Sequence, residues 1–337
     1  MNKLPLLVLA LAALLSPTFA VEYKAERDFI RLVDVNRKAT DQHGDVAVAS
    51  NGEVYISTKD PEAGLQVFSA EGKFIRNVPG APNDFHGFVI HREKEGEFIY
   101  GARNSGQNIL KLTLDGKVVF DIPPSAVPDE FKNKVPPNTK AGPDGKVAKN
   151  PNEGKGVMSL TAMDVAPNGD LYVSDGYASD YVHRFDRTGK YLASFGGKKA
   201  PYGFKTLHKI AIDTRFTPAR IIGVDRANGR VIHMSLDGQF LGVIATDMLL
   251  PAALAIQGDI VVIGELKGQI TILDKAGQVV AKFGTNSTDE AGKNTPEPTA
   301  WRPGMVTAPH GVAFTANGDV LVSEYSKFGR VHKFVRQ

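Results

Sequence analysis

Four of the eight histidines stand at the same place in a repeated sequence pattern. They are His43, His86, His208 and His310, each directly before a short apolar stretch such as "HGFVI" or "HGVAF". Neutral imidazole binds divalent metals well, and three protein ligands leave one position of a tetrahedral zinc ion open for a substrate. The alternative is that histidine merely begins these strands and bonds to backbone carbonyls. Because four histidines share one position, we predict a metal site, with zinc as the leading candidate.

A tyrosine in an unusual place could supply acid–base chemistry. Tyr177 follows Asp175-Gly176 in "LYVSDGYAS", where an alternating strand meets a tight Asp-Gly turn. Such turns usually carry small polar residues. A phenol has a pKa near ~10, and adjacent cations favour its ionised form. Tyr177 is therefore a candidate acid–base residue, and the alternative is an aromatic side chain that binds a peptide or glycan.

The elements that must position these side chains form a repeat of about 40 residues. Each unit has a short apolar strand, a turn, a second strand ending near an acidic residue, a third strand and usually a fourth after a turn such as "DGK". The units begin at His43, His86, Ala162, His208, Ala252 and His310. Because one such unit cannot bury its own faces, the repeat predicts an all-β, six-bladed β-propeller. Its first strands line the central channel, so the four histidines would form a ring.

The two ends of the chain are predicted to share the last blade. The sixth unit ends at "VHKFVRQ" without a fourth strand, and "FIRLVDV" (29–35) has the pattern to supply it and close the ring. A pair of β-sandwiches would not explain the repetition. The segments 123–156 and 285–303 lack apolar periodicity, which predicts long loops. These loops either surround the entrance of an active site or are solvent-exposed insertions without a role in it.

The N-terminus has the features of an export signal. Residues 1–20 combine Lys3, the run "LPLLVLALAALL", and the small residues Thr18 and Ala20 before a cleavage site. The run is too short for a typical membrane span, and no later stretch approaches ~18 apolar residues. We therefore expect a single propeller domain over 21–337, secreted or periplasmic. The absence of cysteine excludes disulfides and thiolate metal sites.

The low net charge and the absence of several motifs limit the classes of partner and reaction that the sequence supports. The formal net charge is only +3, which gives no support to nucleic-acid or membrane-surface binding. The sequence has no Gly-rich phosphate loop after a strand, no HExxH and no GxSxG. We expect a monomer that binds a small-molecule or peptide substrate.

Several stretches resemble successive blades of the peptidyl-α-hydroxyglycine α-amidating lyase family, six-bladed propellers of NHL-type repeats. They are "FHGFVIH", "SDGYASDYVHRF", "DRANGR" and "APHGVAF", and the similarity runs from about 42 to 334. The "SDGY" turn and the "DRANGR" run are the most specific. The resemblance implies a zinc ion held by His86, His208 and His310, a catalytic Tyr177 and a substrate-facing Arg226.

The chain also departs from that family. A second substrate-facing arginine of the family is Lys59 here, which keeps the charge and loses the bidentate fork. Ala308 replaces a methionine, and Gly311 replaces the aspartate of a structural calcium site, which leaves calcium in doubt. His43 falls where the family uses only a backbone carbonyl, and it could be a fourth metal ligand.

The resemblance implies an enzyme, a zinc-dependent carbon–nitrogen lyase that cleaves a carbinolamide to an amide and glyoxylate. Tyr177, Arg226 and Lys59 are the candidate catalytic residues, and for Arg226 the alternative is a salt bridge between blades. A different class of function is a non-catalytic NHL-type propeller that binds a peptide, protein or glycan in the periplasm. A metal hydrolase such as a lactonase is disfavoured, because propeller lactonases rely mainly on acidic and asparagine ligands.

Overall fold

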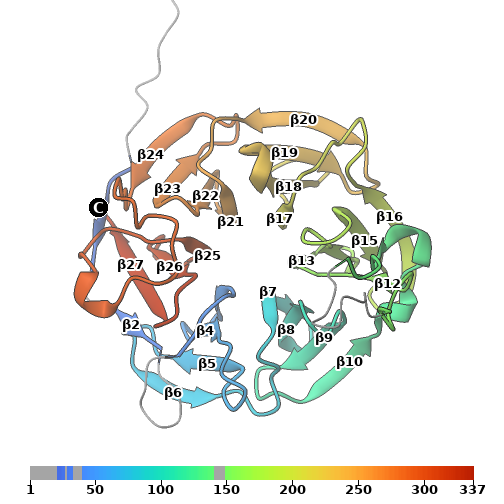
Figure 1. Ribbon diagram of the computed structural model, residues 1–337. Helices are drawn as coiled ribbons and strands as arrows, with labels where there is room; N and C mark the ends of the chain where they lie inside the picture. The colour runs from blue at the N-terminus through green and yellow to red at the C-terminus, as the bar shows by residue number, and fades with distance from the viewer. Residues whose placement is uncertain (1–20, 27–28, 33–39, 140–148) are drawn as a thin grey trace, which may run out of the picture.

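The structure is a computed structural model that describes residues 21–26, 29–32, 40–139 and 149–337. Six sheets are arranged around a central channel (Figure 1). Five are four-stranded antiparallel meanders in chain order, and the sixth takes strands from both ends of the chain. The six-bladed β-propeller predicted from the repeat is confirmed. No helix among the described residues is long and apolar enough to cross a membrane.

The blades follow one another in chain order. The first contains β3 (Val46–Val48), β4 (Val54–Ser57), β5 (Leu65–Phe68) and β6 (Phe74–Asn77). The second contains β7 (Phe85–Glu93), β8 (Gly96–Arg103), β9 (Ile109–Thr113) and β10 (Val118–Ile122). The third contains β13 (Ala162–Val165), β14 (Leu171–Ser174), β15 (Tyr181–Phe185) and β16 (Tyr191–Gly196). The fourth contains β17 (Leu207–Asp213), β18 (Arg220–Asp225), β19 (Arg230–Ser235) and β20 (Phe240–Ala245). The fifth contains β21 (Pro251–Gln257), β22 (Ile260–Glu265), β23 (Gln269–Leu273) and β24 (Val279–Phe283). The sixth contains β25 (Pro309–Phe314), β26 (Val320–Glu324) and β27 (Arg330–Arg336).

The first strand of every blade lies on the channel. Each of these inner strands contacts the inner strand of the next blade, and β25 contacts β3, so the ring is closed. Residues at the start of an inner strand therefore face one another across the axis, although they are far apart in the sequence.

The N-terminal segment completes the last blade. β2 (Ile30–Arg31) pairs with β27, with Ile30 opposite Val331, which confirms the predicted closure of the ring. Residues 33–35 of the predicted strand lie outside the described residues. A second short strand, β1 (Tyr23–Ala25), also pairs with β27 and was not predicted.

The hydrophobic core is divided among the seams between blades. Each apolar cluster of the described residues joins side chains of two consecutive blades. Tyr100 of the second blade packs in one cluster with Phe185 of the third, and Ile30 of the closing strand packs with Ile56 of the first blade. Burying one such side chain contributes about 1.5–3 kcal/mol, so each blade is stabilised mainly by its neighbours.

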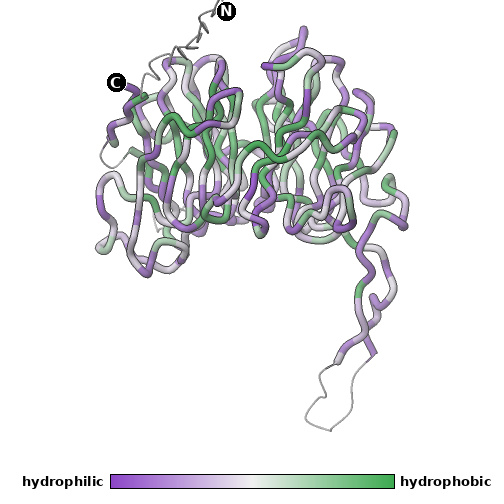
Figure 2. The backbone as a smooth tube through the Cα atoms, turned by 90° about the horizontal axis from the view of Figure 1, so that it is seen from above, coloured by the Kyte–Doolittle hydropathy of each residue, from purple (hydrophilic) through white to green (hydrophobic). Residues whose placement is uncertain are grey.

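The two long segments join an outer strand to the next inner strand. The segment 123–156 carries η1 (Pro124–Ala126), η2 (Asp129–Phe131) and the paired strands β11 (Asn133–Lys134) and β12 (Gly156–Val157), a hairpin that projects from the body of the ring in Figure 2. Val127 of this segment is buried in the core between the second and third blades. The segment 285–303 carries η4 (Pro298–Ala300). Both segments lead into the starts of inner strands, at the end of the channel where the histidines lie.

Candidate active site

The structure brings all four predicted histidines to one end of the channel. His86, His208 and His310 are each the second residue of an inner strand (β7, β17 and β25), and His43 lies just before β3. The ring centroids of His86 and His310 are 4.7 Å apart, and each of these two rings contacts both His43 and His208 at 4.6–4.9 Å.

Backbone carbonyls fix the orientation of three of these rings. Each Nδ1–H donates to a carbonyl of the next blade, and the pairs are His86 with Thr161 at 2.8 Å, His208 with Ala252 at 2.6 Å and His310 with Gly44 at 3.0 Å. A carbonyl can only accept, so Nδ1 carries the proton and Nε2 presents a lone pair. Metal-binding histidines are commonly anchored in this way. The alternative that histidine only bonds to carbonyls accounts for Nδ1 but not for the lone pair on Nε2, which lies near the Tyr177 hydroxyl in His86 and His208 and has no hydrogen-bond partner in His310.

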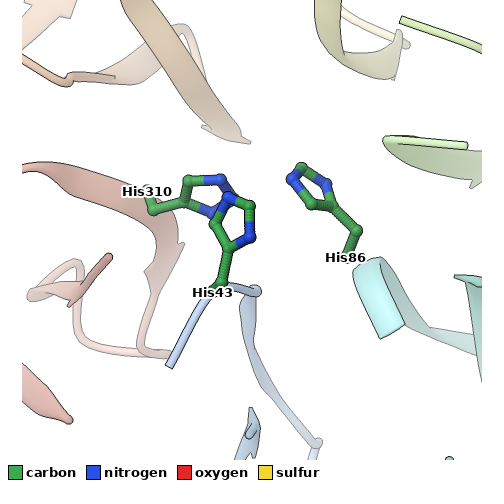
Figure 3. A group of neighbouring side chains, drawn as sticks. All are labelled: His43, His86 and His310. Carbon is green, nitrogen blue, oxygen red and sulfur yellow. The ribbon is translucent and has the colours of Figure 1, made fainter. Parts of the chain in front are cut away.

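One group of nitrogen atoms that could hold a metal ion includes His43, which the resemblance did not imply as a ligand. His43, His86 and His310 each offer one nitrogen, and these three lie within 4.8 Å of one another (Figure 3). His43 is less buried than the other three, and the described residues provide no carbonyl anchor for its ring. His208 is anchored, and its ring contacts those of His86 and His310.

The hydroxyl of Tyr177 lies among the histidine nitrogens. Its oxygen is 2.9 Å from Nε2 of His208, 3.0 Å from Nε2 of His86 and 3.5 Å from Nε2 of His43. Tyr177 lies in the connection between β14 and β15. This connection begins at the end of β14, where Ser174 pairs with Ala162 at the start of β13. Tyr177 therefore does more than pack as an aromatic ring, because its hydroxyl lies within hydrogen-bond distance of two histidine nitrogens.

The nitrogens offer more lone pairs than the hydroxyl has protons. Within the described residues, the single proton of Tyr177 faces the lone pairs of both His86 and His208, and the buried Nε2 of His310 has no hydrogen-bond partner. Buried polar atoms are rarely left without partners. Neutral nitrogen donors converging in this way suit a divalent cation such as zinc, so the residues present fit such an ion.

The Ser-Asp-Gly sequence holds Tyr177 in place. Asp175 accepts hydrogen bonds from the backbone N–H of Ser159 at 2.5 Å and from the hydroxyl of Ser179 at 2.5 Å, which ties the loop to the third blade. Burial raises the pKa of Asp175 to about 6. A Cβ at Gly176 would lie 2.2 Å from the carbonyl oxygen of Leu207 in the next blade, so only glycine fits there.

Arg226 packs against Tyr177. It begins η3 (Arg226–Asn228), after β18, and its Nη1 donates to the Tyr177 hydroxyl at 3.2 Å while its guanidinium carbon lies 5.0 Å from the ring centroid. Among the described residues Arg226 forms no ion pair, so the alternative of a salt bridge between blades is not found.

Burial sets the protonation of the site. It lowers the pKa of His86, His208 and His310 well below the usual 6.5, and burial with Lys59 and Arg226 nearby lowers that of His43 to about 4. The rings are therefore neutral near pH 7. Burial raises the pKa of Tyr177, although Arg226 acts in the opposite direction. The expectation that nearby cations favour the phenolate is not met by Arg226 alone.

Lys59 lies at the mouth of the channel. Its side chain is 45% exposed, and its ammonium is 3.9 Å from Asp41 and 6.0 Å from the ring centroid of Tyr325. It lines a cavity of about 620 Å³ together with His43 and His86.

Two side chains of this end of the channel were missed from the sequence. Arg103, the last residue of β8, lines the same cavity, and Tyr325 packs against His43 with the ring centroids 4.3 Å apart. Both stand at or just after the end of the second strand of a blade, as Lys59, Tyr177 and Arg226 do. Their shared position at the end of a second strand is the sequence feature that could have identified Arg103 and Tyr325.

The residues present do not fit the calcium ion of the resembling family. Gly311 has no side chain, and a Cβ there would lie 2.8 Å from a carboxylate oxygen of Asp45. That carboxylate is ion-paired with the ammonium of Lys209, and both side chains are nearly fully buried. A lysine of the chain therefore already supplies the cation beside this carboxylate. Ala308, which replaces the family's methionine, is fully buried.

Comparisons with known proteins support the fold and a distant sequence relationship. No protein-family model matches the chain. The chain is 26% identical over 245 residues to peptidyl-alpha-hydroxyglycine alpha-amidating lyase 1 of Drosophila melanogaster, which covers 60% of this chain and only 40% of that protein. Virginiamycin B lyase from Staphylococcus aureus is similar in structure, with a TM-score of 0.56 and 14% identity over 93% of this chain and 99% of that one. A structural-genomics protein of unknown function from Bacteroides thetaiotaomicron gives a TM-score of 0.60 and 13% identity over 94% of this chain and 76% of its own. The structural likenesses show the fold alone, and the chain is a six-bladed propeller with distant sequence similarity to an amidating lyase.

Proposed function

We propose that this protein is a metal-dependent carbon–nitrogen lyase that cleaves a carbinolamide, a peptide or acyl group ending in α-hydroxyglycine, into an amide and glyoxylate. The observation that carries the proposal is the Tyr177 hydroxyl, which lies 2.9–3.0 Å from two of the histidine nitrogens that converge on the channel axis. The proposed proton-transfer group is thus in direct contact with the proposed metal ligands. The distant similarity to an amidating lyase supports the same reaction class.

The reaction needs one proton to move and one bond to break. The substrate hydroxyl loses its proton, its oxygen forms the carbonyl of glyoxylate, and the electrons of the C–N bond pass to nitrogen. The nitrogen then takes up a proton, so that atoms and charge balance without a further reactant. A single group that accepts the first proton and returns it to nitrogen satisfies both steps.

Each role has a residue of the chain. The Tyr177 oxygen is placed to carry the proton, and Arg226 holds it by a hydrogen bond and a contact with the ring. His86, His208 and His310 would hold the metal ion, with His43 beside them. When bound, a divalent cation such as zinc supplies Lewis-acid stabilisation of negative charge on the substrate oxygen. Lys59 and Arg226 provide positive charge for a carboxylate.

The test is turnover of N-acetyl-α-hydroxyglycine by zinc-loaded protein, measured as released glyoxylate. Tyr177→Phe fills the same space and removes only the proton carrier, so turnover should fall by ~10²–10⁴-fold while zinc content is kept. Tyr191→Phe is the matched control, because Tyr191 lies on the outer strand β16. Full activity of Tyr177→Phe would overturn the mechanism. A zinc-loaded wild type without turnover would favour the non-catalytic binding propeller.

Export is part of the proposal, since residues 1–20 have the sequence of a secretory signal. The check is the N-terminal sequence of the protein recovered from outside the cytoplasm, which should begin at Val21.

A further inference from the structure

The cavity beside the histidines contains a cation that the proposed mechanism does not use. The cavity has a volume of about 620 Å³, and Lys59, Arg103, Asp84, His43 and His86 contribute to its lining. This volume suits a small molecule, since ligand pockets commonly measure about 300–1,000 Å³. The other lining side chains are polar or small, among them Asn83, Asn104 and Ser105.

Arg103 is held in position by only one edge of its guanidinium group. Its Nε donates to one carboxylate oxygen of Asp84 at 2.6 Å, and the other oxygen of Asp84 accepts the backbone N–H of Gly106 at 2.8 Å. Both oxygens of Asp84 are thereby engaged. Within the described residues, the two terminal nitrogens of Arg103 have no hydrogen-bond partner, and the side chain is 30% exposed.

Gly106 lets the guanidinium lie where it does. A Cβ at this glycine would come within 2.7 Å of both the Cζ and the Nε of Arg103. Any larger residue would push the guanidinium away from Asp84. The loop therefore presents the two terminal nitrogens as a fixed pair of donors beside the histidines.

We propose that Arg103 binds the carboxylate of the ligand, and that the loop 104–106 with Asp84 exists to orient it. This inference rests on the proposed function, whose product carries a carboxylate next to the reacting carbon. Two parallel donors match the two oxygens of a carboxylate, which the single ammonium of Lys59 cannot do. Arg103 of the second blade thus supplies the paired N–H donors that Lys59 of the first blade lacks. The substrate class is a small acid whose carboxylate is adjacent to the carbinolamide carbon.

The experiment measures binding separately from turnover. N-acetylglycine carries the carboxylate without the hydroxyl, so it cannot react, and N-acetylglycinamide is its neutral counterpart. Binding of each to zinc-loaded protein is measured by calorimetry. Arg103→Lys should weaken N-acetylglycine by about 10- to 100-fold and leave N-acetylglycinamide unchanged. Gly106→Ala keeps every charged group and should also weaken the binding of N-acetylglycine, because it displaces the guanidinium of Arg103.

The matched control is Arg92→Lys, an exposed arginine on the same strand as His86 and remote from this cavity. It should bind both probes as the wild type does. Unchanged N-acetylglycine affinity in folded Arg103→Lys and Gly106→Ala would overturn the inference, as would equal weakening of the acid and the amide.

Turnover of N-acetyl-α-hydroxyglycine separates the two proposals. A rise in KM with little change in kcat in Arg103→Lys supports a binding role for Arg103. A wild type that binds the acid through Arg103 and releases no glyoxylate refutes the lyase and keeps the carboxylate site. A wild type that is active, with Arg103→Lys equal to it in KM and in binding, refutes the carboxylate site and keeps the lyase.

Discussion

At the scale of single residues, the channel histidines divide their two nitrogens between two tasks. Nδ1 of His86, His208 and His310 holds a carbonyl of the next blade, which fixes the ring, and Nε2 faces the axis. The same contact therefore joins two blades and orients a candidate metal ligand. His43 has no such anchor among the described residues and is less buried, so it is the weakest candidate ligand of the four.

This difference predicts the metal content of four variants. His86→Ala, His208→Ala and His310→Ala should each lose most of the bound zinc, because a site of three anchored ligands is reduced to two. His43→Ala should retain it. Elemental analysis of the purified proteins measures the outcome, with the blade histidine variant His183→Ala as control. Full zinc in His208→Ala together with loss in His43→Ala would show that His43 is the third ligand.

A histidine inside a blade makes the acid stability of the fold testable. Burial lowers the pKa of His183 to about 3, so the folded protein keeps it neutral. As the pH falls below the unfolded value of about 6.5, the unfolded chain gains a proton that the folded chain does not, and stability is lost. When the pH is lowered from 7 to 5, the free energy of unfolding of His183→Phe should therefore fall by about 2 kcal/mol less than that of the wild type. Urea unfolding at both pH values measures this, and equal losses in the two proteins would contradict it.

The sequence located most of the candidate site and missed part of it. A shared position before an apolar strand was enough to group the four histidines, because inner strands of a ring converge whatever their distance in the chain. Arg103 and Tyr325 share the end of a second strand with Lys59, Tyr177 and Arg226. They were missed because contacts such as that of Arg103 with Asp84 decide which side chains there reach the site. A loop of a few residues leaves no periodic signal.

At the scale of elements, the closing strand is the part of the fold that depends on contacts between the two ends of the chain. The sequence predicted it at 29–35 from its apolar alternation, and pairing is seen at Ile30–Arg31. Strand β1 was not predicted, because "YKA" is too short for a periodic pattern. What fixes both strands is the open edge of β27, which the sequence indicated only through the missing fourth strand of the last unit.

The closing strand should control the stability of the whole ring. Ile30 is 2% exposed and packs between the last and first blades. Ile30→Ala should cost about 2–5 kcal/mol in the free energy of unfolding, because the cavity lies in a seam. The fluorescence of Trp301, the only tryptophan, can follow this seam, since the guanidinium carbon of Arg330 on β27 is 4.8 Å from its ring centroid. Lys24→Gln, at an exposed site on β1, is the control, and equal stability of the two variants would contradict a role for the seam.

At the scale of the whole molecule, a ring of blades has an axis at which charges from opposite sides can meet. Asp45 belongs to the first blade and Lys209 to the fourth, so their ion pair spans the channel beneath the histidines. Lys209 directly follows His208, and Asp45 follows Gly44, whose carbonyl holds His310. The pair therefore connects opposite sides of the ring directly beneath the candidate metal ligands.

This pair predicts a propeller whose stability does not depend on calcium. Lys209→Met leaves the Asp45 carboxylate buried without its partner and should cost roughly 3–5 kcal/mol, whereas replacing both residues with apolar ones should restore much of that loss. Calcium added to metal-depleted wild type should leave the midpoint of thermal unfolding unchanged, because Lys209 already holds the carboxylate. In Lys209→Met the freed carboxylate should make the midpoint rise with calcium, and Lys190→Met, at an exposed site, should behave as the wild type does. Stabilisation of the wild type by calcium would contradict this prediction. It would mean that the ion displaces Lys209 from the Asp45 carboxylate.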